Sequence, residues 1–284
     1  MTDALATLAQ AIRATDPSIR FTMLEVGAVP LGGEPEPFHR LRDLFPGSHI
    51  VAFEVDPALC RSLNEQAPPG HHYYPVALGR HAETRPFYLT RHPMCASLYR
   101  PNEALISLYQ NFEVAYLVSE TTIDTVSLDS FVHDHALGEV DFIKIDIQGA
   151  ELDVFEGGSM TLRATLAVVS EVEFVPHYVD QPLFGDVCRC LDNNGLMFHK
   201  FLGLAGRSLR PIVLNNDANF ASQHIWSDAV FVRHVQRIAQ LSSAQQLKLA
   251  VLAYLYGSAD LTYYCLQRYD EQQGTQLAEI VLRL

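Results

Sequence analysis

The sequence is poor in positive charge. Its 284 residues include 20 Lys and Arg against 33 Asp and Glu, which gives a formal net charge of −13 at pH 7. Nucleic acids and anionic membrane surfaces attract basic proteins. This balance therefore argues against a contact of the whole chain with either of them, although a local basic patch stays open.

Long apolar runs are absent, and cysteines are few. No stretch approaches the roughly 18 consecutive apolar residues of a membrane-spanning helix. The first residues lack the basic start and apolar stretch of a secretion signal. The 5 cysteines are an odd set, and Cys188 and Cys190 have neither a redox nor a zinc spacing. We therefore expect free thiols, no membrane span and a cytoplasmic setting.

Short apolar runs alternate with helical patterns, and 48% of the residues are hydrophobic, enough for a sizeable core. The strand-like runs cover residues 21–26, 49–53, 141–145 and 166–172. Runs of this kind are typical of parallel strands covered on both faces. A helix begins at Pro57, with Asp56 as its expected N-cap. This alternation predicts an α/β fold with a doubly wound, mostly parallel sheet.

The last part of the chain follows another pattern. Residues 196–202 and 226–232 resemble strands with no helix between them, which predicts an antiparallel edge. Beyond residue 235 apolar residues recur at helical spacing. We therefore predict a main domain over residues 1–234 and a small C-terminal helical appendage over residues 235–284. The appendage would pack on the sheet or on a second copy of the chain, and a substrate lid is the alternative.

Carboxylates recur where the predicted strands end. They are Glu25, Glu54, Asp146, Glu151, Glu171 and Glu173. In a doubly wound sheet, ligands bind outside the carboxyl ends of the strands, where the strand order reverses. Carboxylates at the ends of four separate strands therefore predict a ligand site at this edge.

The loop after the first strand is not a phosphate site. Residues 25–33 contain neither the glycine fingerprint of dinucleotide sites nor a phosphate loop, and Pro30 removes a backbone donor. Gly27 would still let the backbone approach a ligand closely, and a tight turn without a ligand is the alternative. Glu54 is suited to the vicinal hydroxyls of a ribose. A phosphate-free nucleoside with a positive charge, S-adenosylmethionine, fits these acidic strand ends.

One segment, residues 142–158 (FIKIDIQGAELDVFEGG), resembles the signature of FkbM-type S-adenosylmethionine-dependent methyltransferases. Weaker pieces follow the order of that family. They are LEVGA (24–28), VAFEVDP (51–57), VALG (76–79), ASL (96–98), TVSLD (125–129) and VSEVE (169–173). Together these pieces cover roughly residues 20–202. The first loop departs from the family pattern, because Glu25 replaces an Asp and residues 28–32 read AVPLG rather than Ala-Asn-x-Gly.

The resemblance implies a Rossmann-like, seven-stranded methyltransferase sheet and methyl transfer to a hydroxyl oxygen. It implies that Glu25 and Gly27 line the methionine end of the cofactor. Glu54 and Val55 would hold the ribose, the pair Ala77 and Leu78 would lie by the adenine, and Asp146 would lie near the reacting methyl group.

Transfer to an alcohol calls for a general base close to the methyl group. His177 follows the predicted fifth strand and is our first candidate, with Glu173, Glu171 and Asp146 as others. A loop histidine bonded to the backbone is the plain alternative for His177. We assign no metal ligands, although Asp146 with Glu171 or Glu173 offers oxygen ligands for a divalent cation. Lys144 and Asp146 would share a sheet face and form a buried pair.

The leading hypothesis is an S-adenosylmethionine-dependent O-methyltransferase of a sugar or small hydroxylated metabolite. We expect loops 85–125 and 203–225 to form the acceptor pocket, no nucleic-acid partner, and a homodimer through the C-terminal helices as an option. The alternative is a non-catalytic interaction protein on a degenerate methyltransferase fold. A nucleotide-dependent oxidoreductase is weaker, because the glycine fingerprint is missing.

Overall fold

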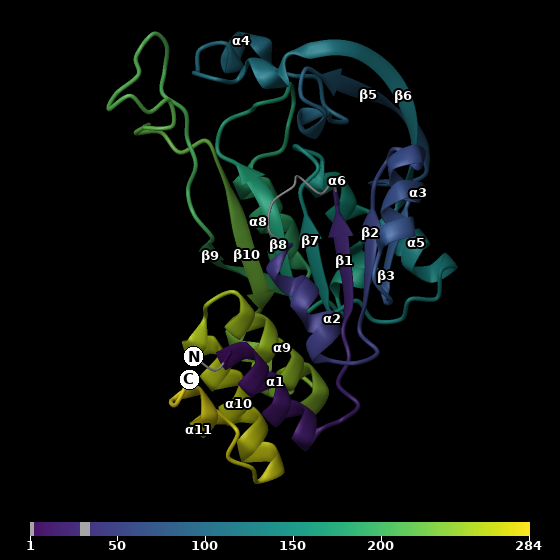
Figure 1. Cartoon of the computed structure of the whole chain (residues 1–284), viewed down its shortest axis with the longest axis vertical. Coiled ribbons are helices and arrows are strands. Elements are labelled where there is room, and N and C mark those ends of the chain that lie inside the picture. The colour runs from purple at the N-terminus through teal and green to yellow at the C-terminus, as the bar shows by residue number, and fades with distance from the viewer. Residues whose placement is uncertain (1–2, 29–34) are drawn as a thin grey trace.

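The computed structural model describes residues 3–28 and 35–284, and a seven-stranded sheet lies at its centre (Figure 1). The strand order is β3-β2-β1-β7-β8-β10-β9. The strands are β1 (Thr22–Val26), β2 (His49–Phe53), β3 (His71–Tyr74), β7 (Phe142–Ile145), β8 (Ala167–Glu173), β9 (Leu196–Phe201) and β10 (Trp226–Arg233). Only β10 runs against its neighbours within this sheet. The predicted doubly wound, mostly parallel sheet with an antiparallel edge is confirmed.

The strand order reverses beside β1. This strand pairs with β2 on one side and with β7 on the other. The central strands are buried along nearly their whole length, as their apolar sequences predict. Separate apolar clusters cover the two faces of the sheet. A crevice for a ligand is expected at the carboxyl ends of β1 and β7.

A second sheet of three strands contains both ends of the segment 85–125, which we expected to form a loop. Its order is β4-β6-β5, with β4 (Ala77–Gly79), β5 (Glu83–Thr90) and β6 (Leu117–Ser127). Most of β6 is exposed and carries Ser, Thr and Glu in place of an apolar alternation. The prediction of a loop over residues 85–125 is therefore wrong for β5 and β6, because these strands bury little apolar surface and give no period-two signal.

Helices cover both faces of the large sheet. The α-helices are α1 (Ala4–Thr15), α2 (Arg40–Leu44), α3 (Pro57–Gln66), α4 (Glu103–Ile106), α5 (Leu128–Asp134), α6 (Glu151–Glu156), α7 (Ser159–Leu162), α8 (Phe184–Asn193), α9 (Ser243–Leu255), α10 (Ala259–Gln273) and α11 (Ala278–Val281). Short 3₁₀ helices are η1 (Pro37–His39), η2 (Pro93–Cys95), η3 (Glu113–Ala115) and η4 (Val235–Gln240). The side chain of Asp56 accepts the backbone N–H groups of Ala58 and Leu59, which confirms it as the N-cap of α3.

The C-terminal helices pack on the sheet together with the first helix. Helices α9 and α10 share one apolar cluster with α1 and with residues of the central strands (Figure 1, yellow and purple). Lys248 of α9 forms an ion pair with Asp141, directly before β7, at 2.8 Å. The rings of Phe142 and Tyr256 stack with centroids 5.7 Å apart. These contacts lie at the amino ends of the strands, away from the expected ligand edge, which agrees with packing and not with a substrate lid.

Across residues 3–28 and 35–284, no helix combines the length and apolar character needed to span a bilayer.

Candidate functional site

A cavity of about 1100 Å³ opens at the carboxyl ends of β1, β2 and β7. All seven residues that the sequence assigns to cofactor binding line it: Glu25, Gly27, Glu54, Val55, Ala77, Leu78 and Asp146. The structure therefore brings together side chains that are up to 121 residues apart in the chain (146 − 25). Their individual roles toward a ligand stay predictions.

Strand pairing brings these residues together. Val26 is level with Phe53 on β2 and with Ile145 on β7. The next residue, Gly27, donates its N–H to the carbonyl of Phe53, and the N–H of Asp146 donates to the carbonyl of Val26. The residues that follow three strands therefore meet at one edge. Residues 29–32, on which the departure from the family pattern rests, lie outside the described residues.

Gly27 occupies a position that only glycine fills without strain. Its φ is +85°, and a Cβ atom there would lie 2.0 Å from the backbone oxygen of Asp146. A side chain at this position would push the ends of β1 and β7 apart. The glycine therefore allows the backbones that follow β1 and β7 to lie in contact at the cavity.

Glu54 is buried at the end of β2 and lines the cavity. One carboxylate oxygen accepts the backbone N–H of Asp56 at 2.8 Å. Burial raises the pKa of Glu54. Because Asp56 caps α3, the carboxylate of Glu54 is not needed as a cap and presents hydrogen-bond acceptors to the cavity.

The wall beside Glu54 is apolar and comes from both sheets. It contains Phe53 of β2, Leu78 of β4, Phe87 of β5 and Leu98. Segment 85–125 therefore contributes to the cavity, as predicted. Of the described residues that line the cavity, none comes from 203–225, so that part of the prediction is wrong.

A cluster of carboxylates follows β7 and β8. Oxygen atoms of Asp146, Glu151 and Glu171 lie within 4.8 Å of one another. The side-chain amide of Gln148 donates to Asp146 at 2.9 Å and to Glu171 at 2.7 Å. Glu151 accepts the backbone N–H groups of Ile147 and Gly149. Polar hydrogens thus occupy the space where a cation shared by these carboxylates would lie.

Burial raises the pKa values of three glutamates at or beside this cluster, Glu151, Glu171 and Glu173. The pKa of Glu151 rises to about 7 because the side chain is desolvated, in spite of its backbone hydrogen bonds. Desolvation and then the charge of Asp146 raise the pKa of Glu171 well above its usual range. Desolvation and the charge of Glu151 do the same for Glu173. Glu151, Glu171 and Glu173 therefore hold a proton up to a higher pH than exposed carboxyl groups do.

Of the four candidates for the general base, only Asp146 is among the described residues that line the cavity. Glu173 is buried in β8, and Glu171 of the same strand does not line the cavity. The ring of His177 packs beside the rings of Phe112 and Trp226, at centroid distances of 5.1 and 6.1 Å. Burial, with a smaller effect of Arg207, lowers the pKa of His177 to about 4. The catalytic roles of these residues stay predictions.

The prediction that Lys144 pairs with Asp146 is wrong, because Lys144 pairs with a different carboxylate. The Nζ atom of Lys144 lies 3.0 Å from the carboxylate of Asp228 on β10. Sequence spacing places Lys144 and Asp146 on one side of β7, but β7 ends before Asp146 and that side chain turns to Gln148.

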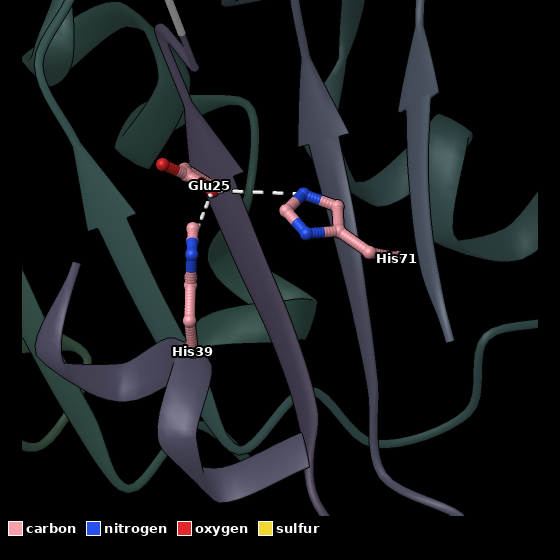
Figure 2. Close-up of side chains that lie close together, drawn as sticks. All are labelled: Glu25, His39 and His71. Carbon is pink, nitrogen blue, oxygen red and sulfur yellow. Dashed lines mark hydrogen bonds and ion pairs between the residues drawn. The ribbon is translucent and has the colours of Figure 1, made fainter. Parts of the chain in front are cut away.

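A third group of polar side chains at the cavity was not expected from the sequence. Oε2 of Glu25 on β1 accepts a hydrogen bond from Nε2 of His39 on η1 at 2.8 Å, and Nε2 of His71 on β3 lies 3.9 Å from the same oxygen (Figure 2). All three line the cavity. We assigned no site role to His39 or His71 from the sequence, because their spacing along the chain matches no metal-binding or catalytic motif.

The profile of the FkbM methyltransferase domain matches residues 25–196, which is more than half of the chain. The chain belongs to the FkbM methyltransferase family. The resemblance inferred from residues 142–158 is therefore confirmed, and the match extends from Glu25, at the end of β1, through the carboxylate cluster. Its end at residue 196 leaves α9, α10 and α11 outside the family domain.

Solved structures of methyltransferases are similar in fold at low identity. An FkbM methyltransferase from Methylobacillus flagellatus KT is 12% identical, with 81% of this chain and 58% of that chain covered and a TM-score of 0.39. Magnesium protoporphyrin IX methyltransferase from Synechocystis PCC 6803, solved with S-adenosylmethionine, is 7% identical over 81% and 78% of the chains, with a TM-score of 0.35. A sugar N-methyltransferase from Streptoalloteichus is 10% identical over 82% and 89%, with a TM-score of 0.34. No curated protein matches the chain.

Proposed function

We propose that this FkbM family protein transfers a methyl group from S-adenosylmethionine to a hydroxyl oxygen of a sugar or another small metabolite. The observation that carries the proposal is the position of Glu54. Its buried carboxylate lies at the end of β2, in the cavity at the point where the strand order reverses. In a doubly wound sheet this is the position from which a carboxylate holds the hydroxyls of a nucleoside.

The residues that line the cavity fit an adenosine. Glu54 offers acceptor oxygens for two neighbouring hydroxyls, and Leu78, Phe53 and Phe87 supply an apolar wall for a flat base. Asp146 supplies negative charge toward a sulfonium. The volume of about 1100 Å³ is at the upper end of small-molecule sites, so a small acceptor has room beside the cofactor.

When bound, S-adenosylmethionine supplies a methyl group on a positively charged sulfur. The protein's task is then to hold the acceptor in line with that group and to receive its proton. We assign the proton to Asp146, which is the one predicted catalytic residue that lines the cavity. Gln148 holds the carboxylate of Asp146 in place through a hydrogen bond of 2.9 Å. Glu171 accepts a hydrogen bond from the same amide at 2.7 Å.

The test is transfer of an isotope-labelled methyl group from S-adenosylmethionine to a panel of neutral sugars and matched amino sugars. We expect label on a neutral sugar, with the carbon chemical shift of a methoxy group. The variant Asp146→Asn should lose at least about 100-fold in rate, as expected for loss of a general base. Asp134→Asn, at an exposed position at the end of α5, is the matched control.

Label found only on amino nitrogen would contradict O-transfer and leave methyl transfer itself intact. Cofactor binding without turnover on any acceptor would favour the alternative of a non-catalytic interaction protein. An unchanged rate for Asp146→Asn would remove the assigned base.

A further inference from the structure

Three side chains of metal-binding type converge at the inner end of the cavity. Glu25, His39 and His71 come from β1, η1 and β3, and one ligand atom of each lies within 4.8 Å of the others. Figure 2 shows both imidazole rings turned toward the carboxylate of Glu25. Three elements from distant parts of the sequence thus contribute to one small polar site.

His71 supplies an independent observation. The residue is 8% exposed, and its Nε2 atom has no hydrogen-bond partner among residues 3–28 and 35–284. A buried polar atom without a partner is unfavourable, because it has lost its hydrogen bonds to water. This atom points toward Glu25 across 3.9 Å, too long for a hydrogen bond.

The spacing fits a small divalent ion. Bonds of about 2.0–2.2 Å in a tetrahedral arrangement place neighbouring ligand atoms about 3.3 Å apart. The two measured separations are 2.8 Å and 3.9 Å, so each would change by about half an ångström, within the reach of side-chain rotation. Two imidazoles with one carboxylate form a ligand set for Zn²⁺ and related first-row ions.

Three basic side chains also line the cavity, and each is paired with a carboxylate: Arg40 with Asp3, Arg42 with Asp43, and Lys144 with Asp228. The nearby guanidinium of Arg42 is paired with Asp43 at 2.8 Å. Glu36 and Asp146 also line the cavity and add negative charge around the cluster. With neutral imidazoles, the three ligands carry one negative charge from Glu25.

We propose that Glu25, His39 and His71 bind one divalent transition-metal ion, represented by Zn²⁺, with a coordination position open toward the cavity. Three protein ligands leave room for a water molecule or for an anionic group of a bound small molecule. The site does not depend on the proposed methyl transfer, because its ligands are groups of this chain alone.

The experiment uses the full chain, freed of metal with a chelator and without S-adenosylmethionine. Zn²⁺ is titrated in competition with a chromophoric chelator, and Co²⁺ binding is followed by visible absorption. We expect one ion per chain and a Co²⁺ spectrum of low coordination number. His39→Ala and His71→Asn should each weaken Zn²⁺ binding at least tenfold. His72→Asn, the exposed neighbour of His71 in β3, should bind as the wild type does.

Circular dichroism of each variant checks that it is folded. His39 lies on a short 3₁₀ helix at the cavity, so His39→Ala remains informative if His71→Asn does not fold. Absence of stoichiometric Zn²⁺ binding would overturn the proposal, as would wild-type affinity in His39→Ala. Binding of S-adenosylhomocysteine is measured on the same preparations, so failure of the metal site and failure of the proposed methyltransferase are read separately.

Discussion

The side-chain amide of Gln148 lies between the carboxylates of Asp146 and Glu171, 2.9 Å and 2.7 Å from their oxygens. One residue thus links the end of β7 to β8, next to the cavity. The carbonyl oxygen of the same amide accepts the hydroxyl of Tyr178 at 3.1 Å, which fixes the direction of the NH₂ group. The amide thus supplies hydrogen-bond donors to oxygen atoms of both side chains.

Removing this amide should destabilise the fold. Gln148→Ala removes the hydrogen bonds that this amide donates to Asp146 and Glu171, and we expect a loss of about 1–3 kcal/mol in the free energy of unfolding. Urea denaturation at pH 7 measures it. Gln10→Ala, at an exposed position of α1, is the control and should change little. Equal stability of the two variants would show that the bridge contributes nothing.

The buried carboxylates should make stability fall as pH rises. A carboxyl group with a raised pKa in the folded state binds protons more tightly there than in the unfolded chain. Its contribution is present below the unfolded pKa and is lost as the pH rises toward the folded value, which is about 7 for Glu151. Glu171 shifts in the same direction.

Glu171→Gln isolates this effect. The variant keeps an oxygen that accepts from Gln148 but cannot ionise. We expect the free energy of unfolding of the variant, minus that of the wild type, to increase steadily from pH 5 to pH 8. Thermal or urea denaturation at fixed ionic strength measures it. Subtracting the wild-type value at each pH cancels the contributions of the other titrating groups. A constant difference, or one that falls over this range, would contradict the assigned direction.

The sequence predicts the parts of the fold in which burial and periodicity coincide. Strand β2 covers His49–Phe53 as expected, because its residues are apolar and its end is marked by Glu54. Asp56 and Pro57 predict the start of α3 by local chemistry alone. Parallel pairing then brings Glu25, Glu54 and Asp146 to one edge, since the carboxyl ends of parallel strands meet there.

Other features depend on contacts that no local pattern encodes. Strand β6 is largely exposed and polar, so it gives no alternating signal. His39 and His71 meet Glu25 only because η1 packs over β1 and β3 in space. Gln148 lies in the segment that resembles the family signature. Its contact with Glu171 could not be predicted from the sequence, because it depends on how β7 pairs with β8. Lys144 pairs with Asp228 because β10 enters the sheet beside β8.

A methyl group at Gly27 should force the ends of β1 and β7 apart next to the cavity. In Gly27→Ala the new carbon would lie 2.0 Å from the backbone oxygen of Asp146, at a φ of +85°. We expect a loss of stability larger than the roughly 1 kcal/mol of conformational strain alone, together with weaker S-adenosylhomocysteine binding. Gly138→Ala is the matched control, because its φ is +72° and no atom lies within 4 Å. Equal losses in the two variants would show that the close contact is unimportant.

The central claim is that this cavity binds S-adenosylmethionine through Glu54, and calorimetry with S-adenosylhomocysteine tests it most directly. We expect one molecule bound per chain. Glu54→Ala should weaken binding by about 10- to 100-fold, in line with about 1.5–3 kcal/mol for hydrogen bonds to a charged group. Glu65→Ala, exposed on α3, should bind as the wild type does. Absence of binding by the wild type, or equal affinity in Glu54→Ala, would contradict the account.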